Sequence, residues 1–229
     1  MPMTPERLNE RLAEAARYAV LRRLAPAIRH DIAGVLQPIS MMAAMLEKRI
    51  RKPDPDLVAL ASNSAAISAM SREAAGSCMS LMTWLAPKEN TAVALNEGIA
   101  DCISLVQTEL SFRGFTLVNK TADVQAELPR NVLRSVFMAA LLTLTDEHEG
   151  PGDVVLAAVA DGAGVSITMS VVPNGGDAQM PSPQNYRELQ WDDVRAIAAV
   201  EQVEIMQSAA RLELRCPLSA GVGPGAGLS

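Results

Sequence analysis

The chain contains two histidines, and His30 is the stronger candidate for chemistry because it stands in Arg29-His30-Asp31, within a long helical pattern. A neutral imidazole can attack a phosphoryl group, and a neighbouring carboxylate can accept or hold the proton released as charge develops. Histidines on solvated helix surfaces are common. These residues alone are therefore compatible with a phosphoacceptor and with a histidine that is merely solvated. His148 lies in the acidic run Asp146-Glu147-His148-Glu149, which favours a solvated loop over a ligand site.

A helix over residues 5–51 is predicted to carry His30. Apolar residues recur along it in steps of three and four, the spacing of a seam in a helical bundle. If this seam faces a second helix, His30 lies on the outer side, where a partner protein can reach it. The seam consists of Leu21, Ala25, Ile28, Ile32, Val35, Ile39, Met42 and Leu46.

Prolines mark the bends and limits of this helix. Pro26 and Pro38 interrupt the pattern and are expected to bend the helix, with Pro26 a candidate break after a shorter leading helix. The run Lys52-Pro53-Asp54-Pro55-Asp56 is a turn followed by a good helix start. A second helix is therefore predicted from Asp56 to about Leu85.

The second helix continues the three-four repeat, so the two helices should pair as an antiparallel hairpin. A single hairpin cannot cover both of its apolar flanks. A twofold dimer that forms a four-helix bundle would bury them, and we therefore predict a homodimer. The repeat runs through Leu57, Leu60, Ala61, Ser64, Ile67, Met70 and Ala74.

A second domain is predicted after the boundary Pro87-Lys88-Glu89-Asn90. The turn Asp161-Gly162-Ala163-Gly164 separates two apolar runs and indicates a β-hairpin, since Asp and Gly tolerate the turn dihedrals. The predicted elements are helices at 95–113, 129–145 and 192–208 and strands at 115–119, 153–160, 165–172 and 211–217.

The predicted fold class is therefore α+β. A helical hairpin occupies residues 1–87, an α/β sandwich occupies residues 88–218, and a small, Gly-rich tail covers residues 219–229 and is expected to be flexible. The length of 229 residues is ample for two modest domains.

Composition excludes several classes of function. Twenty basic against twenty-six acidic side chains give a net charge of -6, and no basic cluster indicates nucleic-acid binding. The three cysteines lack the paired spacing of a zinc site, and we interpret them as reduced core residues. No apolar run has the length of a membrane span, and the charged N-terminus is unlike a signal peptide, so a cytoplasmic protein without a membrane partner is expected.

The segment from His30 to Ser40 resembles the phosphoacceptor box of bacterial histidine kinases. It reads His-Asp-Ile-Ala-Gly-Val-Leu-Gln-Pro-Ile-Ser, and its Leu36-Gln37 and Ile39-Ser40 portions are similar to the subgroup with a Leu-Gln pair after the box. The resemblance implies that His30 accepts a phosphoryl group on a dimerisation hairpin. It also implies an ATPase-like α/β sandwich behind that hairpin.

The sandwich departs from the kinase pattern at three places. Residues 139–144, where kinases carry asparagines that hold magnesium, read Ala-Ala-Leu-Leu-Thr-Leu. The nucleotide loop is replaced by Val172-Pro173-Asn174-Gly175-Gly176-Asp177, and residues 180–191 lack the glycines of a lid. Asn174-Gly175-Gly176 is better interpreted as a turn. Because phosphoryl transfer from ATP needs these contacts, we expect a degenerate domain that binds no ATP.

A phosphoacceptor hairpin joined to such a remnant resembles the ChpT-type histidine phosphotransferases. This resemblance implies a phosphorelay role in which His30 shuttles phosphate between response-regulator receiver aspartates and Asp31 tunes or relays its proton. The chain would bind no cofactor, magnesium would sit on the receiver, and a hybrid histidine kinase is a further candidate partner. Gly34 replaces the Asn or Thr that bifunctional kinases often place there, which puts phosphatase activity in doubt.

Two other interpretations stay open: a non-catalytic signalling scaffold that binds receivers, and an atypical ATP-dependent sensor kinase. A receiver would dock beside His30 on both helices. Four methionines are candidates for that contact, although filling of an aromatic-poor core is the favoured interpretation for each. They are Met41, Met45, Met79 and Met82.

Overall fold

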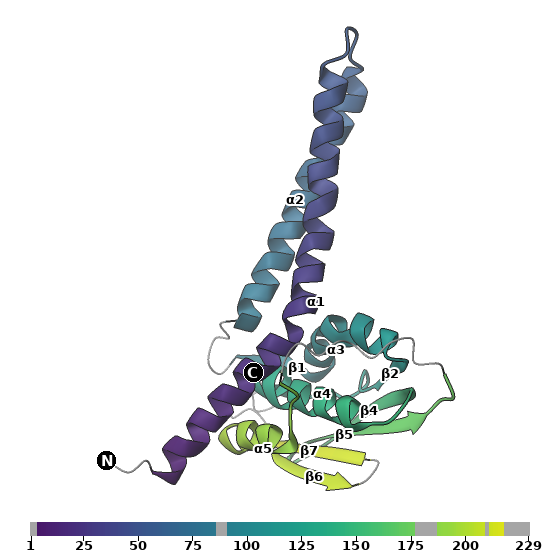
Figure 1. Ribbon diagram of the computed structural model, residues 1–229. Coiled ribbons are helices and arrows are strands. Elements are labelled where there is room, and N and C mark those ends of the chain that lie inside the picture. The colour runs from purple at the N-terminus through teal and green to yellow at the C-terminus, as the bar shows by residue number, and fades with distance from the viewer. Residues whose placement is uncertain (1–3, 86–90, 177–186, 209–210, 218–229) are drawn as a thin grey trace, which may run out of the picture. The chain divides into compact units, whose positions relative to one another are not determined.

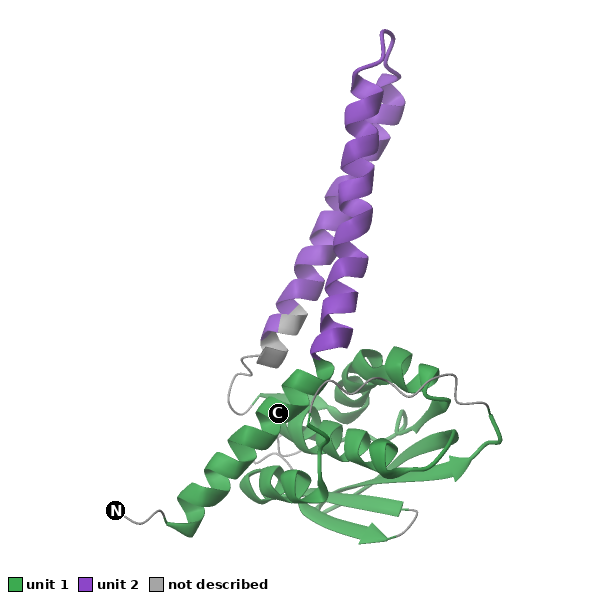
Figure 2. Ribbon diagram, viewed as in Figure 1, with its two compact units in different colours: residues 1–24, 88–229 green, residues 25–87 purple. Residues whose placement is uncertain are grey.

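A computed structural model describes residues 4–85, 91–176, 187–208 and 211–217. The chain divides into two compact units: residues 25–87 form one, and residues 1–24 with 88–229 form the other (Figure 2). The unit formed by residues 1–24 and 88–229, called the sheet unit below and drawn as unit 1 in Figure 2, therefore includes the first residues of the chain, which the sequence had assigned to the hairpin. The predicted boundary at 87–90 and the predicted flexible tail at 219–229 lie outside the described residues.

The first helix, α1 (Pro5–Ile50), is continuous through Pro26 and Pro38 (Figure 1). The prediction that Pro26 separates a leading helix is therefore wrong, although the division between the units falls next to it, between Leu24 and Ala25. A proline inside a helix removes one backbone hydrogen bond, and the remaining hydrogen bonds of the neighbouring turns keep α1 continuous.

The hairpin unit consists of the second part of α1 and of α2 (Leu57–Leu85). Asp56 begins α2 as predicted, because its Oδ1 accepts hydrogen bonds from the backbone N–H groups of Val58 and Ala59, both at 3.0 Å. The predicted seam is half-buried at Leu21 and from Ile28 to Leu46, but its member Ala25 is exposed. On α2 the predicted repeat is buried or half-buried only in part, because Leu57, Ala61 and Ser64 are exposed. Half-buried or buried positions at steps of three and four are Leu60, Asn63, Ile67, Met70, Ala74 and Ser77.

The hairpin buries little by itself. Among its described side chains, Ala74 alone is classed as buried, and the seam residues stay half-exposed. Removing apolar side chains from water supplies most of the stability of a fold. The hairpin therefore leaves large apolar side chains exposed in the single chain, among them Leu57, Met79 and Met82.

The sheet unit is built on a five-stranded sheet in the order β2-β4-β5-β7-β6 (Figure 1). β2 pairs parallel with β4, and the other neighbours are antiparallel. The predicted β-hairpin is confirmed as β4 and β5, whose turn is held by Asp161: its Oδ1 accepts from the N–H groups of Ala163 and Gly164. The strands are β2 (Phe115–Lys120), β4 (Gly152–Asp161), β5 (Gly164–Pro173), β6 (Glu204–Ser208) and β7 (Arg211–Pro217).

Helices pack against one face of this sheet. Alternate residues of the central strands are buried, while the residues between them stay half-exposed or exposed, which is the pattern of a two-layer sandwich. The prediction of an α+β fold is confirmed. The remaining elements are β1 (Ala92–Ala94), α3 (Leu95–Phe112), β3 (Glu127–Pro129), the π-helix η1 (Val132–Phe137), α4 (Met138–Glu147) and α5 (Trp191–Val200).

One predicted element is wrong over half its length. The helix expected over 192–208 ends at Val200, and the chain turns through Gln202, which has φ 57°. Residues Glu204–Ser208 then form the edge strand β6, paired antiparallel with β7. Backbone pairing with β7 therefore outweighs the helical pattern of the local sequence.

The first part of α1 packs within the sheet unit. Arg17 on α1 forms an ion pair with Glu201, which follows α5, at 2.6 Å. The buried residues recur in steps of three or four, as expected for one helix face in contact with a surface. They are Ala13, Ala16, Ala19, Val20, Arg23 and Leu24.

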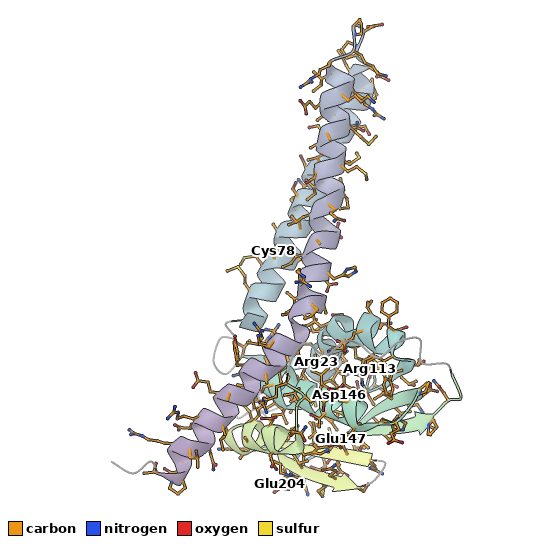
Figure 3. The ribbon with its side chains drawn as sticks, viewed as in Figure 1. Arg23, Cys78, Arg113, Asp146, Glu147 and Glu204 are labelled. Carbon is orange, nitrogen blue, oxygen red and sulfur yellow. The ribbon has the colours of Figure 1, made fainter. Side chains whose placement is uncertain are left out.

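A buried ionic cluster joins α1 to α3 and α4 (Figure 3). Arg23 contacts Glu109 and lies 3.4 Å from Asp146, while Arg113 lies 2.6 Å from the same Asp146 oxygen. Arg113 also donates to the carbonyl oxygen of Thr145 at 2.7 Å. Two arginines and two carboxylates balance in charge, which is the condition under which such groups tolerate burial.

Candidate functional site

His30 occupies an exposed position on α1, as the sequence predicted. At about 100° per residue, it lies roughly 150° around the helix from the seam that faces α2. Among the described residues, the His30 side chain has no hydrogen-bond or ion-pair partner. An exposed imidazole of this kind is free to meet a reacting group carried by another protein.

Asp31 is exposed as well and makes no hydrogen bond to His30. Successive residues of an α-helix point in directions about 100° apart and do not face each other. A proton would therefore pass between the two side chains through water or after a change of rotamer.

The turns on either side of His30 are shaped by Pro26 and Gly34, which flank it at i−4 and i+4 on the same helix face. Pro26 is exposed, and a Cβ built on Gly34 would have no neighbour within 4 Å. Two turns further along, Met41 and Met45 continue this face, and both are exposed. The His30 face is thus open and contains no charged side chain at these four neighbouring positions.

A second exposed stripe lies on another side of the hairpin. On α1 it runs through Ala25, Leu36, Ala43 and Ile50, and on α2 through Leu57, Ala61, Ser64, Ser68, Ala75, Met79 and Met82. Each stripe lies roughly a quarter turn from its seam in the same rotational sense, so the two stripes share one side of an antiparallel pair. We call this surface the stripe face.

The four methionines proposed as contacts thus fall into two groups. Met41 and Met45 share the His30 face, whereas Met79 and Met82 belong to the stripe face. The interpretation that they fill the core is wrong for the single chain, because Met79 is 63% exposed and Met41 is 62% exposed.

The remnant nucleotide region contains few groups that could hold a ligand. Residues 139–143 of α4 are fully buried in the core. Asn174 donates to Asp153 at 2.8 Å and accepts from the Gly176 N–H, while Gly175 has φ 66°, so this segment forms a turn. Of the segment 180–191, the part before residue 187 lies outside the described residues.

The part of that segment that is described belongs to the start of α5. Gln190 and Asp193 form a capping box, and the Trp191 indole donates to Glu147 at 2.5 Å. The described residues contain no cluster of His, Cys, Asp and Glu suited to a metal ion. His148 lies in the loop after α4, where it is half-buried, contacts the Gly150 carbonyl oxygen and packs in a T-shaped arrangement with the Phe115 ring. The prediction that the whole acidic run is a solvated loop is wrong for Asp146 and Glu147, which belong to α4.

In the described parts of the chain, no helix combines the length and the apolar character that crossing a membrane requires.

No protein-family model matches the sequence, and comparison with curated proteins gives no match. Solved structures of low similarity include the Acinetobacter baumannii histidine kinase AdeS, with 9% identity, a TM-score of 0.45, and coverage of 82% of this chain and 98% of that chain. A histidine kinase from Burkholderia phymatum STM815 has 16% identity and a TM-score of 0.45, covering 86% of this chain and 99% of that chain.

A bacterial phosphotransferase solved at 1.7 Å has 13% identity and a TM-score of 0.40, covering 86% of this chain and 94% of that chain. All three TM-scores lie below 0.5. We therefore base the functional proposal on the residues of this chain.

Proposed function

We propose that the chain is a histidine phosphotransferase of a two-component phosphorelay, with His30 as the phosphoacceptor. The observation that carries this proposal is the exposed, unpartnered imidazole of His30 on the outer side of α1, within a box that resembles the histidine-kinase phosphoacceptor segment. The chain would exchange phosphoryl groups with receiver domains of response regulators. A hybrid histidine kinase that carries its own receiver is a further partner of the same class.

The transfer begins with a receiver that carries a phosphorylated aspartate. An unprotonated ring nitrogen of His30 attacks phosphorus, an N–P bond forms, and the P–O bond to the aspartate breaks. The aspartate carboxylate leaves with the bonding electrons. The other ring nitrogen gives up its proton to Asp31, directly or through water, or to solvent. Transfer to a second receiver reverses these steps.

ATP has no role in this proposal. Residues 139–143 of α4, where a kinase would place magnesium-binding asparagines, are apolar or Thr and fully buried, which supports a chain that does not bind nucleotide. Magnesium would be supplied by the receiver, where it neutralises charge on the phosphoryl oxygens during transfer.

The hairpin would act as a homodimer joined through the stripe face. Leu57 is 73% exposed and Met79 is 63% exposed in the single chain, and burial of such side chains is worth about 1.5–3 kcal/mol each. The stripes repeat at the spacing of a four-helix bundle, and a twofold axis would place each stripe against its own copy. His30 lies off this face and would stay accessible in the dimer.

Label transfer from receivers tests the proposal against its alternatives. The full chain is mixed with a panel of receiver domains phosphorylated with ³²P, and separately with labelled ATP. Label that moves from a receiver to the chain, and then to a second receiver, supports the phosphotransferase. Receiver binding without label would favour a scaffold, and labelling by ATP alone would favour a kinase.

A further inference from the structure

The helix next to His30 contains two residues that disfavour helices. Gly34 lies one turn after His30, and Pro38 lies one turn after Gly34. In a regular α-helix the N–H of residue 38 would donate to the carbonyl oxygen of residue 34, but proline has no N–H to donate. The carbonyl oxygen of Gly34 therefore lacks its helical donor, on the same face as the imidazole.

The space beside Gly34 is also empty. Beyond the adjacent residues and backbone of its own helix, a Cβ at this position would have no atom within 4 Å, and Gly34 itself is exposed. Glycine in a helix interior costs stability relative to alanine, and proline in a helix interior costs more. Two unfavourable residues, one helical turn apart and beside the reactive histidine, indicate a requirement other than helix stability.

Any protein that places a phosphoryl group on His30 must also cover Gly34. Residues at i and i+4 of a helix lie about 5–6 Å apart. Side chains on a helix lean toward its N-terminus, so the His30 ring leans toward Pro26 and leaves the Gly34 side clear. Met41 and Met45 extend the same face with exposed apolar surface that an arriving protein can contact.

We propose that Gly34 and Pro38 form the docking notch for the phosphoryl-carrying partner. The partner is the receiver domain of the proposed function, on which this inference rests. Its main chain approaches Gly34 closely because no Cβ is present, and one of its N–H groups donates to the Gly34 carbonyl oxygen. The notch would fix the distance between the receiver's phosphoaspartate and the His30 ring.

Two substitutions separate the effect of the open space at Gly34 from the effect of the free Gly34 carbonyl oxygen. Gly34→Ala fills the notch with a methyl group but keeps the carbonyl oxygen free. Pro38→Ala leaves the notch empty but restores the N–H that occupies this oxygen. Gly76→Ala is the matched control, because Gly76 is an exposed glycine inside α2 that lies off the seam. Beyond the adjacent residues and backbone of its own helix, an added Cβ there would also have no atom within 4 Å.

The measurements are the single-turnover rate of phosphate transfer from a labelled receiver, at varied receiver concentration, and the thermal midpoint of each variant. Gly34→Ala should slow transfer by about 10–100-fold, mainly through weaker receiver binding. Pro38→Ala should slow it by about 3–10-fold. Gly76→Ala should transfer at the wild-type rate, and both glycine variants should melt about 2–4 °C higher than wild type.

Phosphoramidate, a small donor that needs no protein docking, gives the second readout. Labelling of His30 by phosphoramidate should be equal in wild type and in all three variants. Equal receiver transfer by Gly34→Ala and Gly76→Ala would overturn the notch while leaving the proposed function intact. Failure of every receiver to label wild type would overturn the proposed function, and the notch with it.

Discussion

The guanidinium of Arg113 lies 2.6 Å from Oδ1 of Asp146, at the C-terminal end of α4. The Asp146 side chain is 6% exposed, and Arg23 on α1 approaches the same oxygen. One carboxylate thus joins α3 and the first part of α1 to α4. The cluster ties the beginning of the His30-bearing helix into the sheet unit.

Asp146→Ala should destabilise the sheet unit by about 3–5 kcal/mol, because removing one partner leaves buried arginines uncompensated. Urea unfolding followed by circular dichroism measures this change. Asp192→Ala is the control, since its ion pair with Arg195 is exposed, and its effect should stay within about 0.5 kcal/mol. Equal effects of the two substitutions would show that the buried cluster adds no stability.

Leu36→Glu should weaken the proposed dimer by at least about 100-fold in dissociation constant, because it places a charge in the apolar stripe face. Light scattering coupled to gel filtration gives the mass at each concentration. Met41→Glu carries the same change to the His30 face and should leave the dimer intact. If Met41→Glu dissociates the dimer and Leu36→Glu does not, the interface lies on the His30 face, which contradicts the proposed stripe-face dimer.

Asp31→Asn should slow phosphate transfer to His30 by about 100-fold, the lower range of what a positioned proton acceptor contributes. Receiver affinity should not change, because the substitution keeps the size of the side chain and removes its proton affinity. Single-turnover transfer rates and receiver binding, measured on the same protein, separate the two effects. An unchanged transfer rate would assign Asp31 no part in the chemistry.

Cys102 and Cys216 should be inert to thiol reagents in the folded protein. Burial raises the pKa of the Cys216 thiol to about 12, and burial also raises the pKa of Cys102. Cys78 is half-exposed and should react first. Counting thiols labelled before and after denaturation checks this, and rapid labelling of a Cys78→Ser variant would contradict it.

The same thiols give a pH dependence with a defined sign. In the unfolded chain a thiol ionises near pH 8.5, whereas folded Cys216 keeps its proton to about pH 12. The unfolded state therefore binds fewer protons in this window, and the contribution of Cys216 to stability falls as the pH rises through it. Below about pH 8.5 that contribution is fully present. Cys216→Ala should remove this part of the slope in urea unfolding.

Periodicity in the sequence was sufficient to predict the two helices of the hairpin, but not every residue of their seams, since Ala25, Leu57, Ala61 and Ser64 are exposed. The seam from Ile28 to Leu46 and the N-cap at Asp56 depend on local spacing and local hydrogen bonds, and both are confirmed. The exposure of His30 followed from the same seam. The turn at Asp161 was equally local, since its carboxylate accepts from N–H groups two and three residues ahead.

Contacts distant in sequence could not be predicted in this way. The strand β6 depends on its pairing with β7, and its short run with Glu204, Gln207 and Ser208 has no clear strand pattern. The packing of Ala13, Ala16 and Ala19 within the sheet unit required the tertiary structure, because a stripe of alanines does not specify the surface that covers it. The positions of Gly34 and Pro38, one helical turn apart, can be read from the sequence. That the space beside Gly34 is open can be seen only in the structure.

Phosphorylation of His30 by a receiver tests the central claim most directly. Wild type, His30→Ala and His148→Ala would be incubated with a ³²P-labelled receiver, and the label on each chain would be measured together with its acid lability. We predict acid-labile label on wild type and on His148→Ala, and none on His30→Ala. Label of equal intensity on His30→Ala, or none on wild type despite receiver binding, would contradict the assignment of His30 as the phosphoacceptor.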